Sequence, residues 1–295
     1  MELFRALAVL AEPPTVKAAR VAETLGLGLL PTAEEYTELF IFQLCPYASV
    51  YLGAEGMIGG EARDRVAGFW RALGQMPPAE PDHLSVMLAL YARLVELENE
   101  ESDARRREMW HTARKACLWE HLLSWLFVYM NKFSGTATGF YTQWCLLLLR
   151  TLMGEAATLH DQERLPLHLR EAPGMIDPRE QTLDEFLQSL LTPVRSGMIL
   201  TRADLTRAAR QLGLSLRMGE RKFILKALFA QDAGGMFDWL IGETEVWMRH
   251  HRSTKGGMLG EIARWWEHRT EATRALLTEL KLKSRDESRG MRDEG

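Results

Sequence analysis

The chain is poor in cysteine and lacks the common short motifs of catalysis and nucleotide binding. Only three of its 295 residues are cysteines, and none belongs to a CxxC pair. This scarcity argues against a disulfide scaffold or a zinc knuckle and favours a reducing cytoplasm. The sequence has no P-loop, GxGxxG, GxSxG or HExxH pattern. We therefore predict no enzyme activity, no cofactor and no metal site.

Long apolar runs and an excess of positive charge are also missing. The best membrane candidate, residues 121–154, is interrupted by polar residues and glycine at 131–135 and is predicted to form two buried helices. The N-terminus lacks the basic start and the cleavage site of a signal peptide. The formal charge is −4, from 36 Lys and Arg against 40 Asp and Glu, so no global field attracts nucleic acid. Stable membrane insertion and nucleic-acid binding are therefore not expected.

Apolar residues at helical spacing fill most of the chain, with proline and glycine between the segments and no alternating strand pattern. The sequence thus predicts an all-α protein. Thr32 with Glu35, and Thr201 with Asp204, have the spacing of helix-start capping pairs. One predicted helix has an apolar face of Leu84, Met87, Leu88, Tyr91, Leu94 and Val95.

The composition changes along the chain and predicts four parts. Residues 1–158 form a helical core, and residues 159–181, rich in proline and charge, form a linker or long surface loop. Residues 182–283 form a second helical region. Residues 284–295 are predicted to be disordered.

Glu80, Pro81, Asp82 and His83 are crowded together where the helix with that apolar face begins. We expect Asp82 to be the N-cap of this helix and Pro81 to direct the chain into it. The helix cap does not explain why Glu80 and His83 stand there too.

Three blocks of sequence resemble the TorD/DmsD/NarJ family of redox-enzyme maturation chaperones. The first is "EPDH" at residues 80–83. The second, "QLCPYASVYLGAEGMIGGEARDRVAGFWRALG", precedes it, and the third, "WEHLLSWLFVYMNKF…GFYTQWCLLLL", follows it. The resemblance covers about residues 35–155 in the family's order.

This resemblance implies a TorD-like helical bundle with additional C-terminal helices. It also implies a cytoplasmic chaperone, monomeric or homodimeric, rather than an enzyme. Its partner would be the catalytic subunit of a molybdenum-cofactor oxidoreductase, bound through a twin-arginine signal peptide until the cofactor is inserted, which delays export. The residues implied to bind the peptide are Glu80, Pro81, Asp82, His83, Tyr47, Tyr51, Phe69, Trp70, Leu73, His121 and Trp125.

The physical chemistry of these residue types agrees with that implication. Carboxylates form charge-assisted, two-pronged contacts with arginine, and aromatic side chains suit a groove for an apolar peptide. The acidic run from Glu96 to Asp103 offers long-range attraction for a basic segment.

An alternative is a helical DNA-binding transcription regulator that uses the basic residues 201–222, whose pattern resembles a helix-turn-helix. A third alternative is a helical enzyme. It would require a cofactor that no motif in the sequence indicates.

Overall fold

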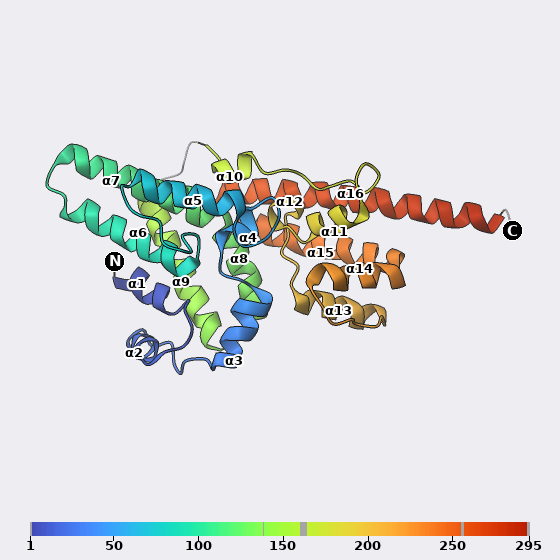
Figure 1. Ribbon diagram of the computed structural model, residues 1–295, viewed down its shortest axis with the longest axis horizontal. Coiled ribbons are helices and arrows are strands. Elements are labelled where there is room, and N and C mark those ends of the chain that lie inside the picture. The colour runs from blue at the N-terminus through green and yellow to red at the C-terminus, as the bar shows by residue number, and fades with distance from the viewer. Residues whose placement is uncertain (1, 138, 160–163, 255–256, 294–295) are drawn as a thin grey trace. The chain divides into compact units, whose positions relative to one another are not determined.

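The computed structural model describes residues 2–137, 139–159, 164–254 and 257–293, with side chains through residue 283. Within these ranges every regular element is a helix, and the strand-like pairing is a single bridge between Tyr47 and His83. The all-α prediction is therefore confirmed. The chain divides into two compact units (Figure 1). Unit 1 comprises Met1–Gly53 and Met57–Glu171, and unit 2 comprises Ala54–Gly56 and Ala172–Gly295.

Unit 1 contains ten α-helices and two π-helical stretches within its described residues. They are α1 (Glu2–Val9), α2 (Val16–Thr24), α3 (Ala33–Tyr36), η1 (Thr37–Gln43), α4 (Ala48–Leu52), α5 (Gly60–Ala72), α6 (Leu84–Glu100), α7 (Ala104–Ala116), η2 (Cys117–Leu122), α8 (Leu123–Thr136), α9 (Phe140–Leu159) and α10 (Leu167–Arg170). The predicted capping box between Thr32 and Glu35 is present at the start of α3.

The core of unit 1 is built around α6 and α8. The whole predicted apolar face of α6, from Leu84 to Val95, is buried. Residues 121–154 are split between η2, α8 and α9, with a break between Thr136 and Phe140. The helix α8 is largely buried, as expected, whereas α9 buries only one face. No helix among the described residues is long and apolar enough to cross a membrane.

The large aromatic side chains of this core carry polar atoms that bond to backbone carbonyls of earlier segments. The Trp144 indole donates to the Leu7 carbonyl at 3.1 Å, and the Tyr129 hydroxyl donates to the Leu44 carbonyl at 3.0 Å. Because a buried polar group costs free energy unless it is hydrogen-bonded, these bonds hold the N-terminal segments to α8 and α9.

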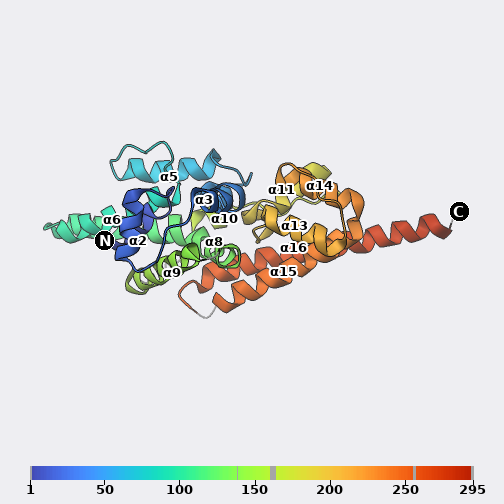
Figure 2. The same cartoon turned by 90° about the horizontal axis from the view of Figure 1, so that it is seen from below.

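Unit 2 contains α11 (Leu183–Leu190), α12 (Pro193–Ser196), α13 (Arg202–Leu212), α14 (Arg221–Gln231), α15 (Ala233–Thr254) and α16 (Gly260–Asp293). The helices α15 and α16 lie side by side (Figures 1 and 2). Unit 1 ends at Glu171, and α10 lies within the stretch 159–181 that the sequence predicts to be a linker. The helix α16 continues to Asp293, through residues predicted to be disordered, and residues 294–295 lie outside the described residues.

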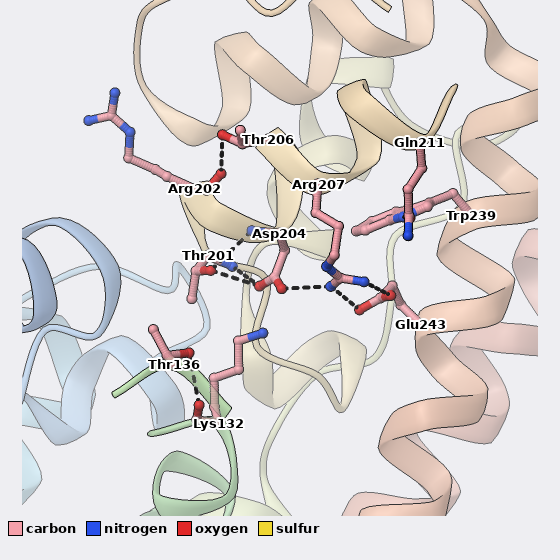
Figure 3. Close-up of polar contacts among 10 residues, drawn as sticks. All are labelled: Lys132, Thr136, Thr201, Arg202, Asp204, Thr206, Arg207, Gln211, Trp239 and Glu243. Atoms are coloured by element: carbon pink, nitrogen blue, oxygen red, sulfur yellow. Dashed lines mark hydrogen bonds and ion pairs between the residues drawn. The ribbon is translucent and has the colours of Figure 1, made fainter. Parts of the chain in front are cut away.

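A buried ionic network joins α13 to α15 (Figure 3). Thr201 and Asp204 form the predicted capping box. Arg207 donates to both Glu243 oxygens, at 2.7 and 2.9 Å, and to Asp204 at 2.8 Å. Its guanidinium also lies 5.3 Å from the centre of the Trp239 ring. The central arginine of the basic stretch therefore points into unit 2 and not toward a DNA groove.

Replacing Arg207 with alanine should lower the free energy of unfolding by about 2 kcal/mol, because Asp204 and Glu243 would stay buried without their cation. The loss falls short of that for a fully buried pair because the Arg207 side chain is 35% exposed. Chemical denaturation measures it, with Arg210→Ala on the exposed side of the same helix as the control. Equal losses in the two variants would show that the network does not stabilise the unit.

Candidate functional site

Helices α4 and α6 begin side by side, at the point where Tyr47 and His83 pair. The Ala48 N–H donates to the Asp82 carbonyl at 3.0 Å, and the Leu84 N–H donates to the Pro46 carbonyl at 2.8 Å. The rings of Tyr47 and His83 meet edge to face, with their centres 4.8 Å apart. This short pairing brings the first of the resembling blocks against the second.

Asp82 bonds the start of α4, whose own N-cap residue is Tyr47, and does not cap α6. Its carboxylate accepts the Ser49 backbone N–H at 3.0 Å, and Asp82 is only 1% exposed. The N-cap of α6 is His83, so the expectation for Asp82 is wrong. The sequence places Asp82 directly before the helix, but the tertiary pairing turns its carboxylate toward the neighbouring helix start.

His83 caps α6 with its imidazole ring. Its Nδ1 accepts the Ser85 backbone N–H at 3.3 Å and lies 2.7 Å from the Ser85 hydroxyl. That hydroxyl donates in turn to Glu12, whose carboxylate lies 3.6 Å from Nδ1. Burial lowers the pKa of His83, although the charges of Glu12, Glu80 and Asp82 oppose the shift.

Glu80 is the exposed member of the motif, whereas Pro81, Asp82 and His83 are buried. The half-buried Tyr47 lies next to it, and burial together with a hydrogen bond to Glu80 raises the pKa of the Tyr47 hydroxyl. Glu80 is thus the carboxylate of the four-residue motif that an incoming cation can reach directly.

Tyr51 and Trp125 lie in the core of unit 1. Tyr51 is 3% exposed and Trp125 is fully buried, and their rings stack with centres 5.1 Å apart. The Tyr51 hydroxyl donates to the Cys45 carbonyl, and the Trp125 indole donates to the His121 carbonyl. Because they are buried, these two aromatic rings pack in the core beneath Tyr47 and cannot contact a partner.

Trp70 and Leu73 line an open groove between α5, α6 and α7. The groove has an empty volume of about 550 Å³, including the part open to solvent. It is lined by Trp70, Leu73, Gln75, Ala89, Leu90, Arg93, Leu94, Leu97 and Trp110. The Trp70 indole N–H is buried and has no hydrogen-bond partner within the described residues. An apolar wall with one unused donor is suited to an apolar segment that brings a carbonyl with it.

Phe69 and His121 meet elsewhere, against α10. Their ring centres are 4.6 Å apart, and His121 lies 5.9 Å from His168. Burial lowers the pKa of His121 to about 3, with a further contribution from His168. Burial also lowers the pKa of His168 to about 4, helped by the charge of Arg65. These imidazoles are neutral packing groups at ordinary pH.

The acidic run Glu96 to Asp103 is largely used within unit 1. Glu96 pairs with Arg5 at 2.6 Å, and Glu98 pairs with Arg114 at 2.9 Å. These internal pairs reduce the charge available to attract a basic segment from a distance. In the part of the chain that the structure describes, no cluster of three or more metal-ligating side chains occurs.

The structure therefore separates the eleven predicted residues into four places: the α4–α6 junction, the core beneath it, the groove and the contact with α10. Their common role as a peptide site stays a prediction. Sequence reasoning missed Glu12, Ser85 and the groove residues Leu90, Leu97 and Trp110. The apolar spacing of α6 identified Leu94 only as core, and no local pattern indicates Glu12, which reaches the junction from the segment after α1.

Comparisons with known proteins find a family model and curated relatives that match part of the chain. Residues 11–130 match the family described as the nitrate reductase delta subunit. Two proteins named chaperone protein TorD, from Vibrio vulnificus strains YJ016 and CMCP6, are each 30% identical to this chain over 105 residues. The match covers 33% of this chain and 49% of each relative, so the chain spans about half the length of the curated relatives it matches. No solved structure matches the chain significantly.

Stability should fall as the pH drops from 6.5 toward 4, because the folded-state pKa of His168 lies below its unfolded value. In that window the unfolded chain binds more protons, whereas above pH 6.5 the stabilisation is complete. The effect of this one group is at most about 3 kcal/mol. Denaturation across this range should show a flatter pH dependence for His168→Gln than for the wild type.

The exposed His268, replaced by glutamine, is the control for that experiment. An unchanged slope in His168→Gln would show that His168 takes up its proton equally in the folded and unfolded states.

Proposed function

We propose that this chain is a cytoplasmic chaperone of the TorD/NarJ family for the catalytic subunit of a molybdenum-cofactor oxidoreductase, because residues 11–130 match the nitrate reductase delta subunit family and two TorD chaperones are similar to the chain. It binds the twin-arginine signal peptide and the apo form of that subunit, assists cofactor insertion and delays export. It acts by binding alone, with no bond made or broken. The comparisons do not favour the DNA-binding alternative, since neither match is described as a DNA-binding protein.

The observation that carries this proposal is the loop between α5 and α6. Trp70 and Leu73, at the end of α5, line one side of the groove, and α6 lines another. The loop that joins the two helices carries the exposed Glu80. The loop between α5 and α6 therefore carries the exposed Glu80 carboxylate and begins beside the apolar groove. These are the two kinds of group that a twin-arginine signal requires.

The arginine end of the peptide would meet Glu80, with the half-buried ring of Tyr47 beside it. A carboxylate binds a guanidinium through two parallel hydrogen bonds, which an ammonium cannot reproduce. Asp82 and His83 act indirectly, because their polar atoms bond the starts of α4 and α6 and thereby place Glu80 and Tyr47. Glu12 adds a second partly exposed carboxylate near the same imidazole.

The apolar part of the peptide would lie in the groove of α5, α6 and α7. Leu90 stands seven residues after His83, which corresponds to about 10 Å along a helix at 1.5 Å per residue. A few residues of extended peptide span that distance. The groove is therefore within reach of a segment whose arginines are held at Glu80.

Glu80→Gln should weaken binding of a synthetic twin-arginine peptide about tenfold, because it removes the carboxylate and keeps its size. The loss should be much smaller with a peptide in which two lysines replace the arginines. Calorimetric titration of both peptides against both proteins measures this coupling. Glu23→Gln, an exposed carboxylate on α2, is the control. Equal losses for the two peptides would remove Glu80 from the arginine contact.

Trp70→Ala should weaken both peptides by the same factor, about tenfold or more, because it truncates an aromatic side chain that contacts the apolar segment. Met109→Ala is the control, since Met109 is 51% exposed on α7 and does not line the groove. Fluorescence anisotropy of labelled peptides gives both affinities. Wild-type affinity in Trp70→Ala would place the apolar segment outside this groove.

A further inference from the structure

Several partly buried arginines in this protein are neutralised by carboxylates. Three of them each bond two carboxylates: Arg65 with Glu61 and Glu171, Arg114 with Glu98 and Glu155, and Arg207 with Asp204 and Glu243. Such pairing offsets the cost of taking a guanidinium out of water. It also raises the pKa of Arg207, mainly through the hydrogen bond to Glu243.

Arg195 and Arg269, in unit 2, have no such partner. Arg195 donates to the carbonyls of Ala54 and Gly174, at 2.7 and 2.9 Å. Arg269 donates to the carbonyls of Pro173 and Ala172, at 2.9 and 3.0 Å. Among the residues that the structure describes, no carboxylate forms an ion pair with either of them. The hydrogen-bond partners of both guanidinium groups are neutral backbone carbonyls.

The two guanidinium groups are held next to each other. Burial lowers the pKa of Arg195, against the charge of the nearby Glu55. Burial also lowers the pKa of Arg269, and the positive charge of Arg195 lowers it further. Two like charges therefore stand together in a partly dehydrated place, without the paired carboxylates that Arg65, Arg114 and Arg207 have.

The close crossing of α12 and α16 fixes this arrangement. Gly197 ends α12 in the left-handed conformation, with φ of 76°, and a Cβ there would lie 2.5 Å from the Thr270 backbone nitrogen. The Thr270 hydroxyl donates to the Gly197 carbonyl at 2.9 Å. Arg195 precedes Gly197 by two residues, and Arg269 directly precedes Thr270. The backbones of α12 and α16 therefore come close together next to Arg195 and Arg269. The backbone contact, and not only the flexible side chains, keeps the two arginines near each other.

We propose that Arg195 and Arg269 form a binding site for a phosphoryl oxyanion. Each guanidinium has five N–H donors, and the bonds described use two of them. The planar forks that remain match the oxygens of a phosphate, which accepts charge-assisted, two-pronged contacts. The Trp265 ring, 4.7 Å from the Arg269 guanidinium, covers one face of that group and leaves its edge as the donor side.

The bound anion would also stabilise unit 2. Both arginines hold the segment Ala172–Gly174, and Arg195 holds Ala54, so a ligand that neutralises them strengthens contacts within the unit. Ligand that binds only the folded protein raises its melting temperature with ligand concentration. This site lies outside residues 11–130 and goes beyond the proposed peptide binding.

The test uses the full-length protein with inorganic phosphate, pyrophosphate or chloride at equal ionic strength. The melting temperature should rise with phosphate and pyrophosphate beyond the effect of chloride, and calorimetry should give a saturable affinity. Tighter binding of pyrophosphate indicates a ligand with linked phosphates, whereas equal affinities indicate a single phosphate group. Either result supports the site.

Arg195→Gln and Arg269→Gln should each weaken phosphate binding about tenfold or more, because each removes a charged donor. Arg217→Gln, an exposed arginine of the same unit, should bind phosphate as the wild type does. Arg195→Lys and Arg269→Lys keep the charge and serve where a glutamine variant does not fold. These lysine variants should lose less phosphate affinity than the glutamine variants, because lysine keeps the charge but cannot make the two-pronged contact.

No stabilisation beyond that of chloride, up to tens of millimolar phosphate, overturns the proposal. Wild-type affinity in folded variants of both arginines overturns it as well. Twin-arginine peptide titration of the same variants keeps the two proposals apart, because the anion site and the peptide site use different residues.

Discussion

Two helices begin at one point in unit 1, and each of two consecutive residues accepts one backbone N–H from one of these helix starts. Asp82 accepts an N–H at the start of α4, and His83 accepts one at the start of α6. A helix start leaves backbone donors without partners, and buried donors of this kind are costly. The short pairing of Tyr47 with His83 keeps the two starts together. This junction fixes the position of the α5–α6 loop that carries Glu80, and with it one wall of the groove.

The junction also explains why four such different residues stand side by side. Pro81, Asp82 and His83 are buried and build the turn, whereas Glu80 remains in solvent. The structural roles of Asp82 and His83 and the recognition role proposed for Glu80 therefore do not compete for the same oxygens. The same division extends to the aromatic residues. Tyr51 and Trp125 fill the core under the junction, and Trp70 faces the groove.

Charge is handled in two ways across the molecule. In the α6–α7–α9 and α13–α15 contacts, an arginine is enclosed by two carboxylates, so the network is complete and serves packing. At Glu80, and at Arg195 with Arg269, the charge is left uncompensated within the described residues. At Arg195 and Arg269 the charge is also partly buried, which is unfavourable in isolation and becomes favourable when a ligand supplies the counter-charge, whereas Glu80 is exposed and accessible to a cation. These two places, one in each unit, are where binding of a charged partner is expected.

The sequence by itself determined the helical class, the capping boxes at Thr32 and Thr201 and the buried face of α6, because these follow from residue spacing within a few turns. It also indicated the resemblance to the TorD/DmsD/NarJ family, through three blocks in that family's order. Only the tertiary structure decided which helix start Asp82 bonds, that Glu12 and Ser85 reach His83, and that Trp70 faces a groove while Trp125 does not. Those outcomes depend on contacts between segments tens of residues apart, and local patterns carry no information about which distant backbone donor or apolar face a side chain will meet.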